Sequence, residues 1–180
     1  MRLFIAILFE EKNKETLYEL TQKLRSKTLL GNTTRRDNLH LTLAFIGEVP
    51  DSAYKKVCAV MDVLRSEPFT LTFSEFGKFA QQDEKLYWLG AQHCEALNSL
   101  QKQLTGALEA NQIPVDKKPF KPHITLGRRM VMAEDFSENE FAAQIVPVVQ
   151  KVKAISLMKS ERIDGKLTYT QIYQRKLKGK

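Results

Sequence analysis

The sequence predicts an α+β fold in which two pseudo-symmetric lobes, each with an antiparallel sheet, line a central cleft and keep their helices outside. Three observations predict it. Strand-like and helix-like apolar patterns alternate along the chain, one segment alternates apolar and polar residues strictly, and each half places a long amphipathic helix before a strand with a His-x-Thr triplet. Because 180 residues suffice for one well-cored domain, we expect residues 1–180 to form a single domain with two internal lobes.

The first half of the chain is predicted to contain two strands and two helices. Strands are expected at residues 2–9 and 39–46, and helices at residues 14–27 and 51–64. The first strand is apolar at almost every position, which is typical of a strand covered on both faces. The first helix places Leu17, Leu20 and Leu24 on one stripe, and the second begins with the capping residues Asp51 and Ser52.

The second half is predicted to contain one helix and a series of antiparallel strands. Strands are expected at residues 69–75, 85–91, 123–129, 146–158 and 167–173, and a helix at residues 95–111. In the first of these strands Phe69, Leu71 and Phe73 alternate with polar residues, and a polar turn at 81–84 leads to its partner. The last two strands are joined around Asp164-Gly165, a common turn dipeptide.

Composition restricts the class of protein and of site. No apolar run approaches the ~20 residues that span a bilayer, and the apolar N-terminal stretch is too short for a secretory signal. Cys58 and Cys94 allow one disulfide, but a cytoplasmic protein with two free thiols is the expected case. They form no CxxC pair and only three scattered histidines are present, so we expect no metal site. We also expect no cofactor. The net charge of +7 favours a polyanionic partner. We expect a monomer without an obligate protein partner.

The two His-x-Thr triplets are the main functional signal. They are His40-Leu41-Thr42 and His123-Ile124-Thr125, one in each half. Since residues i and i+2 of a strand share a face, each triplet presents an imidazole beside a hydroxyl and turns its aliphatic residue to the core. We expect the two strands to face each other across the cleft and to form one site. The alternative is a pair of strand histidines that only cap the edge of a core.

These groups suit displacement at a phosphodiester. A neutral imidazole accepts a proton from attacking water, and a protonated one donates a proton to the departing oxygen, each contributing about 10²–10⁴ in rate. Hydroxyls can donate to the non-bridging oxygens as charge develops there. No serine or cysteine with an adjacent base is evident. The two motifs are so alike that their chemistry alone does not assign acid and base.

Arg128 follows the second triplet and is a candidate phosphate-binding residue. Strict alternation from His123 would place Arg129 on the histidine's face instead, and a bulge at Gly127 would reverse this. A solvated surface arginine is the alternative interpretation.

Other candidates are aromatic or basic. Phe45 and Phe120 could stack a base of single-stranded RNA, although core packing is the stronger interpretation for Phe45. Lys121 could attract RNA to the cleft, or belong to an ordinary solvated loop. Trp88 is interpreted as a packing residue, and His93 as a structural or surface residue.

At the paired motifs the sequence resembles the 2H phosphoesterase superfamily, and within it the bacterial RNA 2′,3′-cyclic phosphodiesterases, historically called 2′-5′ RNA ligases. The resemblance covers nearly the whole chain, through residues 1–7, 38–49, 88–90 and 120–128, and Ser160, Gly165 and Tyr169. One departure is the segment 34–37, Thr-Arg-Arg-Asp, where relatives often have an aromatic residue and prolines. This departure puts in question how the nucleoside is held.

The resemblance implies hydrolysis of the 2′,3′-cyclic phosphate at RNA 3′ ends to a 2′-phosphate. It implies that His40 is the proton donor to the leaving 3′ oxygen, that His123 is the proton acceptor from water, and that Thr42 and Thr125 assist them. Three alternatives remain: a phosphodiesterase acting on 2′-5′-linked oligonucleotides or a small cyclic nucleotide, a reversible 2′-5′ RNA ligase and a noncatalytic RNA-binding module.

Overall fold

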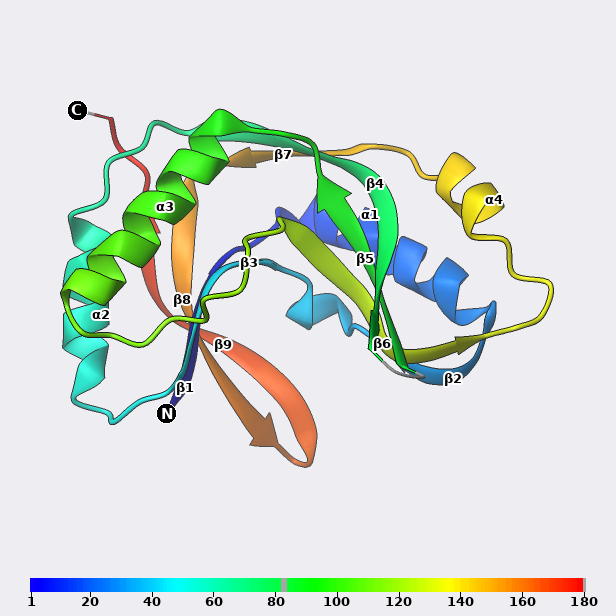
Figure 1. Ribbon diagram of the computed structural model, residues 1–180, viewed down its shortest axis with the longest axis horizontal. Helices are drawn as coiled ribbons and strands as arrows, with labels where there is room; N and C mark the ends of the chain where they lie inside the picture. The colour runs from blue at the N-terminus through cyan, green and yellow to red at the C-terminus, as the bar shows by residue number, and fades with distance from the viewer. Residues whose placement is uncertain (82–83, 180) are drawn as a thin grey trace.

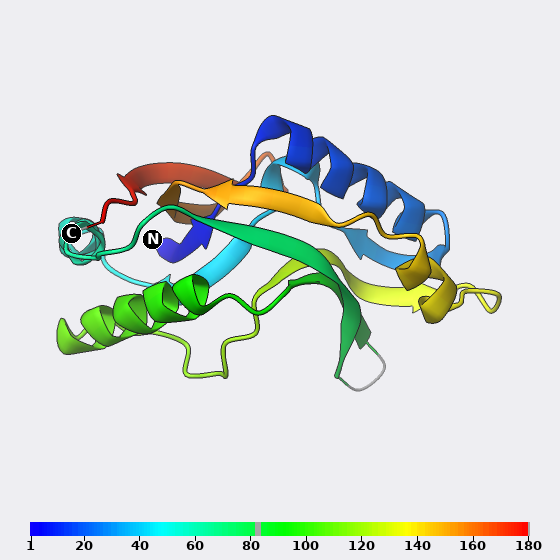
Figure 2. The ribbon, with the colours of Figure 1, turned by 90° about the horizontal axis from the view of Figure 1, so that it is seen from above.

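The structure is a computed structural model that describes residues 1–81 and 84–179, which form one curled antiparallel sheet flanked by helices (Figure 1 and Figure 2). The strands are β1 Arg2–Ile7, β2 Thr28–Thr33, β3 Leu41–Glu48, β4 Phe69–Gln81, β5 Glu84–Ala91, β6 His123–Met132, β7 Val148–Val152, β8 Ala154–Ile163 and β9 Lys166–Lys176. The helices are α1 Glu11–Arg25, α2 Ala53–Asp62, α3 Glu95–Ala110, α4 Glu138–Ala143 and the 3₁₀ turn η1 Arg36–Asn38. The predicted α+β class is confirmed.

The sheet has two halves that meet between the strands of the two motifs. Its order is β7-β4-β5-β6-β3-β1-β8-β9, and β2 also pairs with β6. β3 and β6 pair antiparallel at one register position, Leu41 with Ile124. The prediction placed these strands opposite each other, whereas the structure makes them neighbours in one sheet. The junction between the lobes is therefore the place where the two motifs touch.

α1 and α3 each cover the half of the sheet to which their preceding strand does not belong. α1 follows β1, yet it contacts β2, β6 and β7. α3 follows β5, yet it contacts β3 and α2, and α2 contacts β9. Figure 1 shows α2 and α3 at one end of the sheet and α1 behind the other. The two halves thus exchange helices, and neither half completes its core alone.

The core has the apolar residues that the sequence patterns select. Leu17 and Leu24 of α1 are fully buried, as are Leu97, Leu100, Leu104 and Leu108 of α3. β1 is buried on both faces, as predicted, because Leu3 and Ile5 enter the main core and Phe4 and Ala6 form a second small cluster with Met158. That second cluster lies beside the first motif.

Three features differ from the sequence-based expectation. The strand expected at 146–158 is two strands separated at Lys153, because β7 pairs with β4 in one half and β8 with β1 in the other. β2 was missed since its leucines, Leu29 and Leu30, are about two-thirds exposed and leave no burial pattern. The short elements η1 and α4 were also missed. In the turn predicted at 81–84, residues 82 and 83 lie outside the described residues.

Cys58 and Cys94 are free, as expected. Within residues 1–81 and 84–179, no helix has both the length and the apolar character needed to cross a membrane.

Candidate active site

The pairing of β3 with β6 brings the two triplets into one constellation. Leu41 lies opposite Ile124, and both are fully buried. The histidine and the threonine of each triplet flank this pair, and His123 is near enough for its charge to act on His40. The two triplets therefore lie at one junction.

Both histidine rings are oriented by a backbone carbonyl two residues earlier. His40 Nδ1 lies 2.7 Å from the carbonyl oxygen of Asn38, and His123 Nδ1 lies 2.6 Å from that of Lys121. A carbonyl oxygen only accepts hydrogen bonds, so in each ring Nδ1 holds a proton and donates it. Nε2 is then the nitrogen that gains and loses a proton during a reaction. His40 Nε2 lies 3.0 Å from Thr42 Oγ1.

Each histidine packs against two aromatic side chains. The centroid of His40 is 4.9 Å from that of Phe4 and 5.2 Å from that of Tyr169, whose ring is perpendicular to it. The centroid of His123 is 5.2 Å from that of Phe79 and 6.3 Å from that of Trp88. Sequence reasoning did not select these residues for the site, because nothing in the chain places β1, β4 or β9 beside the motifs.

Burial lowers the pKa of both histidines. For His40 the pKa falls to about 4, because burial outweighs the hydrogen bond to Asn38, and the charges of Arg128 and His123 lower it further. For His123 burial is again the main cause, with Arg128 and Lys121 adding to it. Both rings are therefore mainly neutral in the unliganded chain at neutral pH. An anion bound between them would raise both pKa values.

Arg128 lies on the histidines' side of β6. Its Nη2 is 3.5 Å from Thr125 Oγ1, and its charge acts on both imidazoles. The bulge that this placement needs is present: Trp88 pairs with Thr125 and Tyr87 with Gly127, so β6 has one extra residue ahead of Arg128. A second extra residue lies between Gly127 and Met130, where Arg129 has a φ of 56°. The site thus contains a cation beside two hydroxyls, a suitable set of donors for phosphate oxygens.

Replacing Arg128 by alanine is expected to lower kcat/KM on a phosphodiester by about 10–100-fold, because a charge-assisted hydrogen bond to phosphate is lost. Steady-state kinetics measure this effect. Arg129→Ala, at the next position of the bulge, is the matched variant and is expected to change kcat/KM less. Equal losses in the two variants would contradict the assignment of Arg128.

The remaining candidate residues, Lys121, Phe120 and Phe45, each make a different contact. Lys121 Nζ lies 4.1 Å from the ring centroid of Trp88, which is buried as expected. Phe120 is partly buried against the main core. Phe45 is 36% exposed and lies under the guanidinium of Arg2, 5.2 Å away. Its ring therefore contacts a cation of β1.

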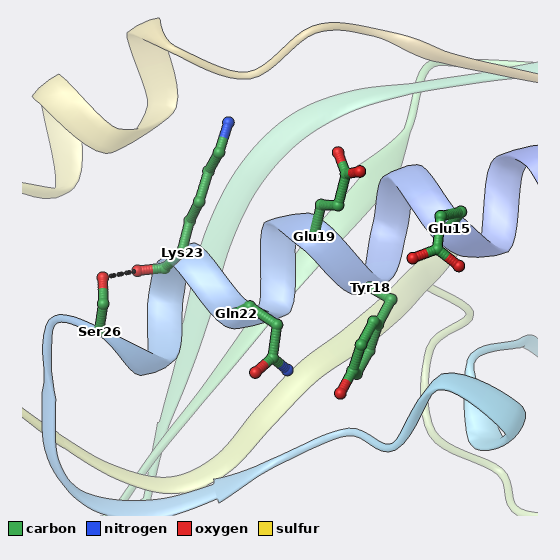
Figure 3. A pocket seen from close by; sticks show the side chains of 6 residues that line it. All are labelled: Glu15, Tyr18, Glu19, Gln22, Lys23 and Ser26. Atoms are coloured by element: carbon green, nitrogen blue, oxygen red, sulfur yellow. Dashed lines mark hydrogen bonds between the residues drawn. The ribbon is translucent and has the colours of Figure 1, made fainter.

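His93 is an exposed residue, as expected, and its Nε2 lies 3.0 Å from Glu95 Oε1. A hollow along α1 contains no residue of either motif (Figure 3). It is lined by Glu15, Tyr18, Glu19, Gln22, Lys23 and Ser26. Since no histidine lines it, the candidate site remains the junction of β3 and β6.

Comparison with known proteins finds the same family by sequence and by structure. The chain matches the 2′-5′ RNA ligase superfamily over residues 7–164. It is 32% identical over 131 residues to the RNA 2′,3′-cyclic phosphodiesterase of Thermotoga maritima, covering 71% of this chain and 70% of that one. For the enzyme of the same name from Geobacillus stearothermophilus, the identity is 28% over 129 residues, which span 70% of this chain and only 41% of that relative.

The solved structures agree over the full chain. Escherichia coli LigT in apo form superposes with a TM-score of 0.80 at 28% identity, covering 98% of this chain and 96% of that one. The LigT complex with 3′-AMP superposes with a TM-score of 0.79 at 29% identity, covering 98% and 97%.

Proposed function

The chain belongs to the 2′-5′ RNA ligase superfamily, and on that premise we propose that it is an RNA 2′,3′-cyclic phosphodiesterase that leaves a 2′-phosphate. The observation that supports this most directly is the joining of both His-x-Thr triplets at one register position, Leu41 with Ile124. Several relatives share the name RNA 2′,3′-cyclic phosphodiesterase. The net charge of +7 suits an RNA substrate.

In the proposed mechanism His123 takes a proton from water through Nε2, and His40 donates a proton from Nε2 to the leaving 3′ oxygen. The resemblance to the family assigns these roles. Burial lowers the pKa of His40 to about 4 in the unliganded chain, so the donor role requires that the bound substrate raise this pKa. His40 gains this proton when the anionic substrate binds, since a nearby negative charge stabilises imidazolium.

Thr42, Thr125 and Arg128 hold the phosphate in this mechanism. Water attacks phosphorus on the side of His123 while the bond to the 3′ oxygen breaks on the side of His40, so the 2′ oxygen keeps the phosphoryl group. The threonine hydroxyls and the guanidinium donate to the non-bridging oxygens as their charge increases. Phe45, Phe120 and Lys121 were expected to bind substrate. Of these, Lys121 contacts the ring of His123 through its backbone carbonyl oxygen, 2.6 Å from Nδ1.

The test is incubation with an RNA that ends in a 2′,3′-cyclic phosphate, in buffer that contains a metal chelator. We expect complete conversion to the 2′-phosphomonoester, identified by chromatography against both phosphate isomers. A 3′-phosphate product would contradict the proposed roles of the two histidines, and a requirement for metal would contradict the mechanism. A parallel panel with 2′-5′-linked oligonucleotides, and with RNA ends bearing a 5′-hydroxyl, separates the phosphodiesterase from the two related activities.

A further inference from the structure

The β8–β9 hairpin reaches the first motif although it projects from the body of the protein (Figure 1). Two residues of β9 make this contact. The ring of Tyr169 stands perpendicular to that of His40 at 5.2 Å, and the carbonyl oxygen of Leu167 accepts a hydrogen bond of 2.9 Å from Asn38 Nδ2. Arg35 Nη1 donates to the same carbonyl at 3.2 Å. The hairpin is thus tied to the segment that leads into β3.

Asn38 links this hairpin to the ring of His40. Its side-chain amide donates to the hairpin, while its own carbonyl oxygen, 2.7 Å from His40 Nδ1, fixes the histidine's tautomer. Asn38 is only 7% exposed, so a loss of either bond would not be fully replaced by water. The position of the carbonyl that orients His40 is therefore set by a contact with a distant part of the chain.

We propose that Asn38 is a positioning residue, which holds the acid–base histidine His40 in its working orientation by anchoring its own carbonyl to the β8–β9 hairpin. The inference rests on the proposed phosphodiesterase function for its kinetic consequence. The bond to Leu167 restrains Asn38, the restrained carbonyl keeps the proton on Nδ1, and Nε2 is left to face Thr42 and the substrate. Misplacement of a catalytic group by about 1 Å can cost 10²-fold in rate.

The second motif provides an internal comparison. The ring of His123 is oriented in the same way by the carbonyl of Lys121, at 2.6 Å. The side chain of Lys121 is not tied to the hairpin, because its ammonium group lies over the ring of Trp88. A change at Asn38 should therefore alter the ring of His40 and leave that of His123 as it was.

The first measurement needs no variant. Nitrogen NMR of the imidazole rings in the wild-type protein should show both His40 and His123 as the Nδ1–H tautomer when neutral. Asn38→Ala should then increase the Nε2–H population of His40 alone. A wild-type His40 in the Nε2–H form, or an Asn38→Ala spectrum unchanged at His40, overturns the inference. Neither result depends on the identity of the substrate.

The kinetic measurement uses a matched asparagine. Asn13 Nδ2 donates to the carbonyl of Val149 at 2.8 Å, which is a similar long-range bond, made to the edge strand β7. Asn38→Ala should lower kcat on a 2′,3′-cyclic phosphate by roughly 10–100-fold with little change in KM, whereas Asn13→Ala should keep the wild-type kcat. If Asn38→Ala does not fold, Asn38→Ser replaces it. Equal kcat values in folded variants of the two sites overturn the inference, while inactivity of the wild-type protein overturns only the proposed function.

Discussion

Replacing either His40 or His123 by alanine is expected to lower kcat/KM on a 2′,3′-cyclic phosphate RNA by about 10²–10⁴, because each removes one proton transfer. The double variant should lose little more than the worse single variant. In the proposed mechanism the two rings act on one phosphorus, so without one of them the other has no complete reaction to assist. Initial rates with purified single and double variants measure this.

His93→Ala is the control for these variants, since His93 is the remaining histidine and lies exposed beside Glu95. It should retain wild-type kinetics. The pH dependence adds a second criterion: the wild-type profile should be bell-shaped, and each motif variant should lose one limb. Wild-type turnover in His40→Ala would contradict the role of His40, whereas RNA binding without turnover in the wild-type protein would support an RNA-binding module.

The free energy of unfolding should fall as pH decreases from about 6.5 to 4, and His40 should be a main cause. In the unfolded chain an imidazole binds a proton near its ordinary pKa of 6.5, whereas burial in the folded chain lowers the pKa to about 4. Between these values the unfolded state binds more protons, so acid favours unfolding. The full shift corresponds to about 3 kcal/mol at 1.36 kcal/mol per unit.

Urea unfolding at several pH values between 7 and 4 measures this dependence. The glutamine in His40→Gln cannot titrate, so the free energy of unfolding of this variant should change less over that pH range than that of the wild-type protein. This holds even if the two proteins differ in stability at pH 7. His93→Gln, at an exposed position, should keep the wild-type slope. Parallel curves for His40→Gln and the wild-type protein would show that the ring of His40 is not held in its neutral form.

Most strands and the three long helices could be predicted from the sequence, because their burial patterns repeat within a few residues. Leu17 and Leu24 fix a helix face, and the alternation from Phe69 to Phe73 fixes a strand. β2 gave no such signal because its leucines remain exposed. The break at Lys153 was hidden for another reason: both strands beside it have strand-like patterns, and only their different partners separate them.

The candidate site was predictable where its residues lie close together in the sequence. His40 with Thr42, and His123 with Thr125, follow from strand parity. Arg128 could be predicted only conditionally, since its direction depends on a bulge that the sequence permits at Gly127 but does not require. Tyr169 was not predictable from local pattern, because β9 reaches His40 through the order of strands in the sheet.

Leu41 and Ile124, the middle residues of the two triplets, fill the core and also pair with each other, so they fix the register of β3 against β6. A strand that slips by one residue turns every side chain to its opposite face. Such a slip of β6 against β3 would send His123 and Thr125 inward and bring Ile124 out. The two aliphatic side chains resist it, since both are fully buried and would have to leave the core together. The aliphatic residues of the two triplets thus fix the strand register that places the histidines and threonines on the same face.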